Sequence, residues 1–150
     1  MVNQINIEFQ KGGKFIADMF EDVAPKICKA VWDALPIVSD AQHAQYSGQL
    51  IFFFTPTIKF DETENPKWMG LFPGDLGFNP HSLHKLHLPP SNFPHEVSIV
   101  YGGCLPADWC GPSPVNNFGR IVYGDLNELT EIGKRNRREG FEKITINRKQ

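Results

Sequence analysis

The sequence predicts a mainly β protein, a small closed barrel or sandwich whose ends are covered by two helices. About seven or eight short segments rich in β-branched and aromatic residues are separated by Gly and Pro turn signals, which is typical of such folds. Two segments instead place apolar residues at helical spacing. An amphipathic helix must bury its apolar stripe, and an open barrel end offers a partner for it.

Composition and charge indicate an ordinary globular chain and narrow its partners. The 150 residues, 41% of them apolar, favour one domain spanning 1–150. The net charge of −2 provides no global attraction for nucleic acid or an anionic lipid surface, so we expect neither as a partner. A local basic cluster falls at the end of the second expected helix, where cations complement the helix dipole: Lys134, Arg135, Arg137 and Arg138.

The cellular compartment is expected to be the cytoplasm. No run approaches the ~20 apolar residues that cross a bilayer, and the first residues carry no secretion signal. Three cysteines form no even framework, which fits a reducing environment.

The first third of the chain predicts a hairpin, a helix and two strands. Residues 5–9 alternate with period two, residues 11–14 form a turn and residues 15–20 form a second strand. We expect Asp22 to cap a helix with Pro25 in its first turn, ending before Pro36. Cys28 on its buried face is expected to be a small core residue. Residues 37–46 are polar for a strand, whereas residues 50–55 are strongly apolar and should be central in the sheet.

The remaining elements follow after a polar loop at 59–68. Residues 73–80 and 97–103 form two strands that enclose a loop holding four of the five histidines. A Pro/Gly-rich loop at 104–116 precedes a strand at 118–123. Asp125 and Glu128 form a capping-box pattern that opens the second helix, and Gly133 should weaken that helix. Residues 141–146 form a last strand, which we expect to pair with the first.

Many short motifs along the chain form a pattern through their order, although none of them is specific alone. They are Ala24-Pro25, Trp32-Asp33-Ala34-Leu35-Pro36, Ala41-Gln42-His43-Ala44, Ser47-Gly48, Glu64-Asn65, Pro73-Gly74-Asp75-Leu76, Tyr101-Gly102 and Asn117-Phe118. In this order, and over nearly the whole chain, they resemble the cyclophilin-like superfamily, and within it a largely uncharacterised bacterial family.

The resemblance implies a closed cyclophilin-like β-barrel capped by two α-helices. It extends distantly to opine synthases of the cucumopine and mikimopine type, which join an amino acid to a keto acid by a Pictet–Spengler cyclisation. We carry over no catalytic residue from them, so this link is one of fold. True cyclophilins have a strand of the form Arg-Val-Ile-x-x-Phe-Met, and no such segment occurs here. Prolyl isomerisation is therefore a minor hypothesis.

Three residues are candidates for acid–base chemistry. His43 lies on a polar strand beside an apolar one, and an imidazole titrates near neutral pH; it is equally a surface strand histidine. Glu64 could orient His43 or take a proton, or it could be solvated in its loop. Tyr101 ends an apolar strand before two glycines, where its hydroxyl could face a pocket or its ring could lie on the barrel rim.

Three further residues are candidates for substrate binding. The amides of Asn65 and Asn117 could bind a carboxylate or carbonyl, although asparagine is also a routine turn residue. Arg120 is the basic residue expected on a core strand, where it could hold a carboxylate bidentately or point outward to solvent. Asp75 follows Pro73-Gly74 in turn chemistry and is expected to be structural.

Metal binding is not expected at the histidines. His81, His84 and His87 are spaced by three, but Pro80, Pro89 and Pro90 bracket them and disfavour a helix that would align them. Cys104 and Cys110 share one loop, yet their spacing matches no common zinc motif and does not establish a disulfide.

The expected function is a cofactor-independent enzyme acting on a small, polar, carboxylate-bearing metabolite, by lyase, isomerase or cyclising condensation chemistry. His43, Glu64 and Tyr101 would carry the chemistry, and Asn65, Asn117 and Arg120 would bind the substrate. The alternative is a module that binds a ligand or partner without catalysis. Apolar loop residues such as Phe93 and Trp109 make a homodimer plausible.

Overall fold

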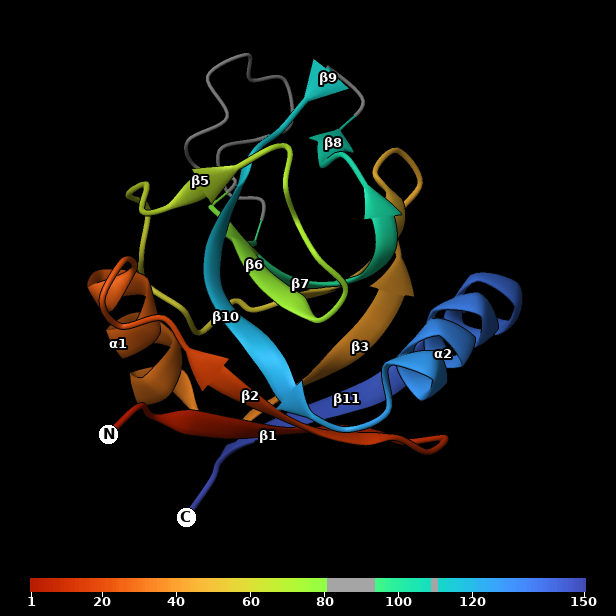
Figure 1. Ribbon diagram of the computed structural model, residues 1–150, viewed down its shortest axis with the longest axis horizontal. Coiled ribbons are helices and arrows are strands. Elements are labelled where there is room, and N and C mark those ends of the chain that lie inside the picture. The colour runs from red at the N-terminus through yellow and green to blue at the C-terminus, as the bar shows by residue number, and fades with distance from the viewer. Residues whose placement is uncertain (81–93, 109–110) are drawn as a thin grey trace.

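A computed structural model describes residues 1–80, 94–108 and 111–150, which form an eight-stranded antiparallel barrel with two helices (Figure 1). The elements in chain order are β1 (Gln4–Phe9), β2 (Lys14–Met19), α1 (Pro25–Ala34), β3 (Ile37–His43), β4 (Gly48–Phe54), β5 (Pro66–Lys67), β6 (Asp75–Asn79), β7 (Glu96–Cys104), β8 (Ala107–Asp108), β9 (Gly111–Pro112), β10 (Val115–Tyr123), α2 (Leu126–Glu139) and β11 (Glu142–Arg148). The expected mainly β architecture is confirmed.

The barrel closes because β2 pairs with strands on both of its sides. The neighbours run β2-β1-β11-β3-β4-β7-β6-β10, and β10 then pairs with β2. The last strand lies against the first, with Ile7 opposite Ile146, as the sequence predicts. The two-residue β5 adds to the edge of β10.

The two helices lie on opposite sides of the barrel in Figure 1 and bury their apolar stripes against it. α1 contributes Ile27, Cys28 and Val31 to the core, and α2 contributes Leu129 and Ile132. α2 packs over β3, β4 and β7. Neither helix is long and apolar enough to span a membrane, and no other described segment is a helix of that kind.

The start of α1 differs from the expectation that Asp22 caps it. The N-cap residue is Ala24, which supplies no side-chain cap. Instead, the carboxylate of Glu64, from a distant loop, accepts hydrogen bonds from the first helical amides. Capping across a long sequence separation cannot be read from local spacing, which explains the error.

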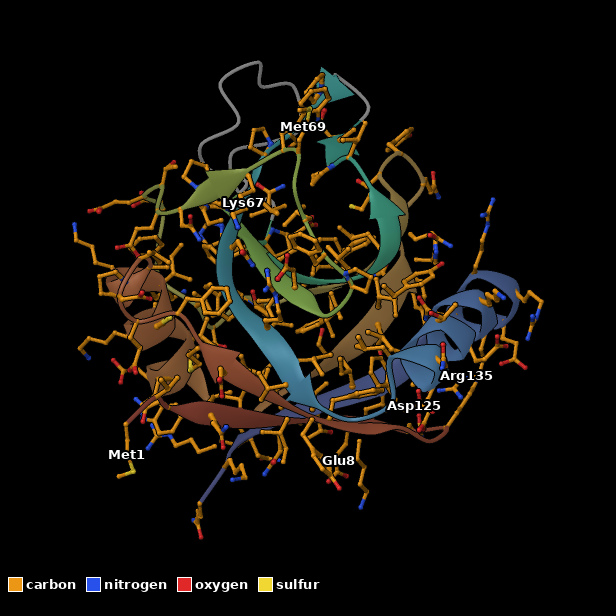
Figure 2. All side chains as sticks on the ribbon, viewed as in Figure 1. Met1, Glu8, Lys67, Met69, Asp125 and Arg135 are labelled. Carbon is orange, nitrogen blue, oxygen red and sulfur yellow. The ribbon has the colours of Figure 1, made fainter. Side chains whose placement is uncertain are left out.

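β3 and α2 show how tertiary contacts override local signals. The polar segment after Pro36 forms a strand to His43 because Ile37 and Ala41 alternate inward while β11 and β4 pair on either side. Asp125 caps α2 as expected, accepting from the amide of Asn127 at 2.8 Å, where β10 meets the helix (Figure 2). Gly133 is buried in the middle of α2.

Candidate functional site

The structure brings His43 and Tyr101 together at one end of the barrel. His43 continues the inward alternation of Ile37 and Ala41 on β3, and Tyr101 continues that of Val97 and Ile99 on β7. The two rings meet edge to face, with centroids 5.7 Å apart. Nε2 of His43 lies 2.6 Å from the hydroxyl oxygen of Tyr101.

A second hydrogen bond fixes the protonation pattern of the imidazole. Nδ1 of His43 lies 2.7 Å from the carbonyl oxygen of Ala44, which can only accept, so Nδ1 carries the proton. In the neutral ring Nε2 is then an acceptor, and the hydroxyl of Tyr101 donates to it. When His43 gains a second proton, Nε2 donates to the phenol oxygen instead.

Tyr101 is held from behind by α2. A Cβ added at Gly133 would lie 2.3 Å from Cε1 of the tyrosine ring, so only glycine allows this close approach. Burial raises the pKa of Tyr101, and the positive charge of Arg137 partly opposes that rise. The phenol therefore stays protonated near neutral pH and acts as a hydrogen-bond donor.

A cleft of about 420 Å³ opens beside the pair, and His43 lies in its wall. Its walls come from the end of β3, the turn into β4, the segment around β8, and the last turn of α2. Tyr101 does not line the cleft and is only 4% exposed. His43 is thus the member of the pair that a bound molecule would meet.

Asn136 and Arg137, neighbours near the end of α2, also line the cleft. The amide nitrogen of Asn136 donates to the carbonyls of Ala41 at 2.8 Å and of Gly140 at 3.0 Å, which ties the helix end to β3. Its Oδ1 is buried and has no hydrogen-bond donor among the described residues. Arg137 is exposed and has no ion-pair partner among the described residues.

The structure places Glu64 away from the imidazole of His43. Its Oε1 accepts from the amide of Ile27 at 2.7 Å and its Oε2 from the amide of Lys26 at 3.2 Å. A carboxylate at this position also complements the positive end of the helix dipole. Glu64 thus caps α1, and the described residues show no pairing between it and His43.

Asn65 and Asn117 are hydrogen-bonded to each other where the loop before β5 meets β10. Asn65, with φ of 46°, donates through Nδ2 to the carbonyl of Asn117 at 2.8 Å. Asn117 is fully buried, and its Nδ2 donates to the carbonyls of Leu76 and Gly119. The neighbouring Asn116 accepts from the amide of Glu64. These amides fasten the loop before β5 to the barrel and do not line the cleft.

Arg120 holds a carboxylate, but one from its own chain. Its Nε donates to Oδ1 of the fully buried Asp75 at 2.6 Å, while Oδ2 accepts from the amide of Phe72. The guanidinium lies over the rings of Phe20 and Phe72, 5.7 and 5.2 Å from their centroids. Asp75 is structural, as expected.

Several residues that the sequence singled out cannot be placed at a site. His81, His84, His87, Phe93, Trp109 and Cys110 lie outside the described residues. Within the described ranges no three His, Cys, Asp or Glu side chains are grouped to hold a metal ion. Cys28 is the buried core residue expected, and burial raises its pKa to about 12.

Sequence reasoning named Gly133 only as a residue that weakens the helix and Arg137 only as part of the basic cluster, and it did not name Asn136. The place of all three at the site was missed. One signal was present: Leu129, Ile132, Gly133 and Asn136 continue the apolar stripe of α2 at spacings of three and four, so the glycine and the amide fall on its buried face. Nothing local distinguishes Arg137 from the other cations of the basic cluster.

Comparison with known proteins gives a family and a fold. The family model described as protein of unknown function DUF3830 matches residues 7–148. No curated protein matches the chain.

Solved structures are similar over the whole chain. McbB in complex with tryptophan has a TM-score of 0.72 at 20% identity, covering 97% of this chain and 44% of McbB, so this chain spans less than half of McbB. A hypothetical protein from Archaeoglobus fulgidus has a TM-score of 0.64 at 23% identity, covering 99% of this chain and 95% of its own. A cyclophilin-type peptidyl-prolyl cis-trans isomerase from Cryptosporidium parvum has a TM-score of 0.57 at 15% identity, covering 100% and 99%. At these identities they show a shared cyclophilin-like fold, which confirms the expected barrel.

Proposed function

This chain belongs to the DUF3830 family and has a cyclophilin-like fold, and on that premise we propose that it is a small-molecule enzyme. It binds a carboxylate-bearing metabolite in the cleft beside β3 and acts on it by acid–base chemistry. The observation that carries the proposal is that His43 and the exposed Arg137 line the same cleft. Arg137 takes the carboxylate-binding role that the sequence suggested for Arg120.

Binding follows from the chemistry of Arg137. Its guanidinium has no ion-pair partner in the described part of the chain, so it can meet a ligand carboxylate with two parallel hydrogen bonds. Asn136, hydrogen-bonded to β3, fixes the helix turn from which Arg137 projects. The ligand is thereby held beside the imidazole.

Proton transfer takes place at His43, whose Nε2 is hydrogen-bonded to the hydroxyl of Tyr101. The hydrogen bond to Ala44 fixes the tautomer, and Nε2 is the nitrogen that takes or releases a proton. Because its pKa is raised, Tyr101 keeps its own proton near neutral pH and orients the ring. A lyase, isomerase or condensation step at a carbon beside the ligand carbonyl needs this kind of base.

A binding module without catalysis is the second candidate. It is favoured by the fact that both ring nitrogens of His43 already have partners within the protein. Proton transfer to a ligand requires Nε2 to exchange the hydroxyl of Tyr101 for the ligand. A pure binding protein would need no such exchange.

The deciding experiment measures exchange of the methyl protons of pyruvate in D2O by NMR, with binding measured separately by calorimetry. An enzyme accelerates the exchange, and His43→Gln lowers the rate by roughly 100-fold or more while binding persists. Binding without accelerated exchange supports the second candidate.

A matched pair of variants tests the carboxylate site. Arg137→Gln should weaken pyruvate binding about tenfold, because a charge-assisted pair is lost. Arg138→Gln, one residue along and outside the cleft, should leave it unchanged. Equal affinities of the two variants for pyruvate would contradict a carboxylate site at Arg137.

A further inference from the structure

Part of the cleft lining is apolar, and a short polar acid would not cover it. Leu50 and Phe52 on β4 alternate away from the barrel core and line the cleft, together with Ala44 and Ala107. Leu50 is only 4% exposed, so the half-buried Phe52, Ala44 and Ala107 supply most of the apolar surface that faces water. Removing such surface from water needs an apolar group on the ligand. The cleft thus combines apolar surface with one cation, Arg137, and two acidic residues, Glu96 and Asp108, so Arg137 is the lining residue that can attract a carboxylate.

Two exposed aromatic rings stand at the rim of the same cleft. Tyr46, in the turn between β3 and β4, is 58% exposed, and Phe141, between α2 and β11, is 65% exposed. Phe141 follows Arg137 by four residues, so one rim ring and the guanidinium come from neighbouring backbone. Aromatic side chains that border a pocket favour stacking or edge contacts with another ring.

The size of the cleft also exceeds what a short acid fills. Its volume of about 420 Å³ lies within the range of small-molecule pockets, roughly 300–1,000 Å³. Acetate or pyruvate would leave most of it to solvent.

We propose that the ligand of this cleft is an aromatic carboxylate. Its carboxylate pairs with Arg137, and its ring covers Leu50 and Phe52 between the side chains of Tyr46 and Phe141. This inference rests on the proposed function and names the class of its ligand. It replaces the small polar acid of the general proposal with an amphipathic one.

Three probes separate the ring from the charge: acetate, phenylacetate and phenylacetamide. Phenylacetate has the carboxylate and the ring, acetate lacks the ring, and phenylacetamide keeps the ring without the charge. Affinities are measured by NMR titration of the uniformly labelled protein. Phenylacetate should bind about tenfold or more tightly than either of the other two.

Variants locate the ring. Phe141→Ala and Tyr46→Ala should each weaken phenylacetate binding about threefold to tenfold and leave acetate unchanged. Tyr123→Ala is the matched control, because Tyr123 is 71% exposed and lies outside the cleft. In the wild-type protein, ring-current shifts should appear at the methyl groups of Leu50.

The outcomes distinguish this inference from the proposal beneath it. If acetate binds as tightly as phenylacetate, in an Arg137-dependent way, the aromatic inference fails and the carboxylate site stands. If phenylacetamide binds as tightly as phenylacetate, the carboxylate site fails. If Tyr123→Ala weakens phenylacetate as much as Phe141→Ala does, the ring lies elsewhere and the inference is overturned.

Discussion

Replacing Gly133 by alanine tests whether close packing of α2 on Tyr101 sets the position of the His43–Tyr101 pair. The added Cβ would lie 2.3 Å from Cε1, 2.4 Å from Cζ and 2.6 Å from Cδ1 of the tyrosine ring. All three distances are far shorter than a carbon–carbon contact at about 3.5–4.0 Å. If the ring moves, the phenol oxygen is displaced from Nε2; if the helix moves, the amide of Asn136 is displaced from the carbonyl of Ala41.

Two opposing effects decide the size of the change. Alanine is favoured over glycine in a helix by about 1 kcal/mol. Overpacking a close-packed core costs about 1–3 kcal/mol, and this contact is at the severe end. We therefore expect a net loss of about 1–2 kcal/mol, which lowers Tm by about 2–8 °C for a domain of this size.

A double-mutant cycle isolates the contact. In a Tyr101→Ala background the ring is gone and only the helix preference remains, so Gly133→Ala should raise stability by about 1 kcal/mol. Thermal unfolding measures all four proteins, and NMR of the His43 ring nitrogens reports the Nε2 hydrogen bond in the single variant. If Gly133→Ala stabilises the protein with Tyr101 intact, or changes stability equally in the two backgrounds, the packing explanation is refuted. Unmoved His43 nitrogen shifts beside a loss of stability would show that the helix has moved and not the ring.

Three further outcomes follow from the structure. Glu64→Ala should lower the free energy of unfolding in urea by about 1 kcal/mol, because α1 loses its cap. Glu62→Ala, which removes an exposed ion pair, should change it by less than about 0.5 kcal/mol, and equal losses would contradict the capping role. The raised pKa of Tyr101 means that the unfolded state releases this phenolic proton first, so stability should fall above about pH 10 and this part of the fall should vanish in Tyr101→Phe. Burial raises the pKa of Cys28 to about 12 and of Cys104 to about 11, so alkylation of these two thiols, measured residue by residue by mass spectrometry, should keep rising with pH well past 9. A midpoint near pH 8.5 would contradict their burial.

Much of the fold can be predicted from the sequence because the spacing of apolar residues within each segment indicates a strand or a helix. The alternation at residues 5–9 and 15–20 predicts the hairpin, and the apolar run after Ser47 predicts a central strand. The wrong cap at Asp22 marks the limit of this reasoning. The group that caps α1 comes from Glu64, 37 residues from Ile27, and a competing local candidate hid it.

The sequence suggested two residues of the candidate site but not the contact between them. His43 and Tyr101 were named separately, and their hydrogen bond across 58 residues could not be seen. The side chains suggested for substrate binding can form the required hydrogen bonds, but they form them with groups of the protein itself: Asn65, Asn117 and Arg120. Only burial and partners distinguish a binding group from a structural one, and neither is a property of sequence spacing.

Local sequence patterns are enough to predict the strands of the barrel, the two helices and the residue types able to move a proton or bind an acid. Each of these depends on neighbours within a few positions, where periodicity and turn chemistry act. The tertiary structure alone decided that Gly133 seats Tyr101 behind His43 and that Arg137, among four clustered cations, reaches the cleft. Barrel closure and helix docking set these contacts, and they join residues that share no local pattern.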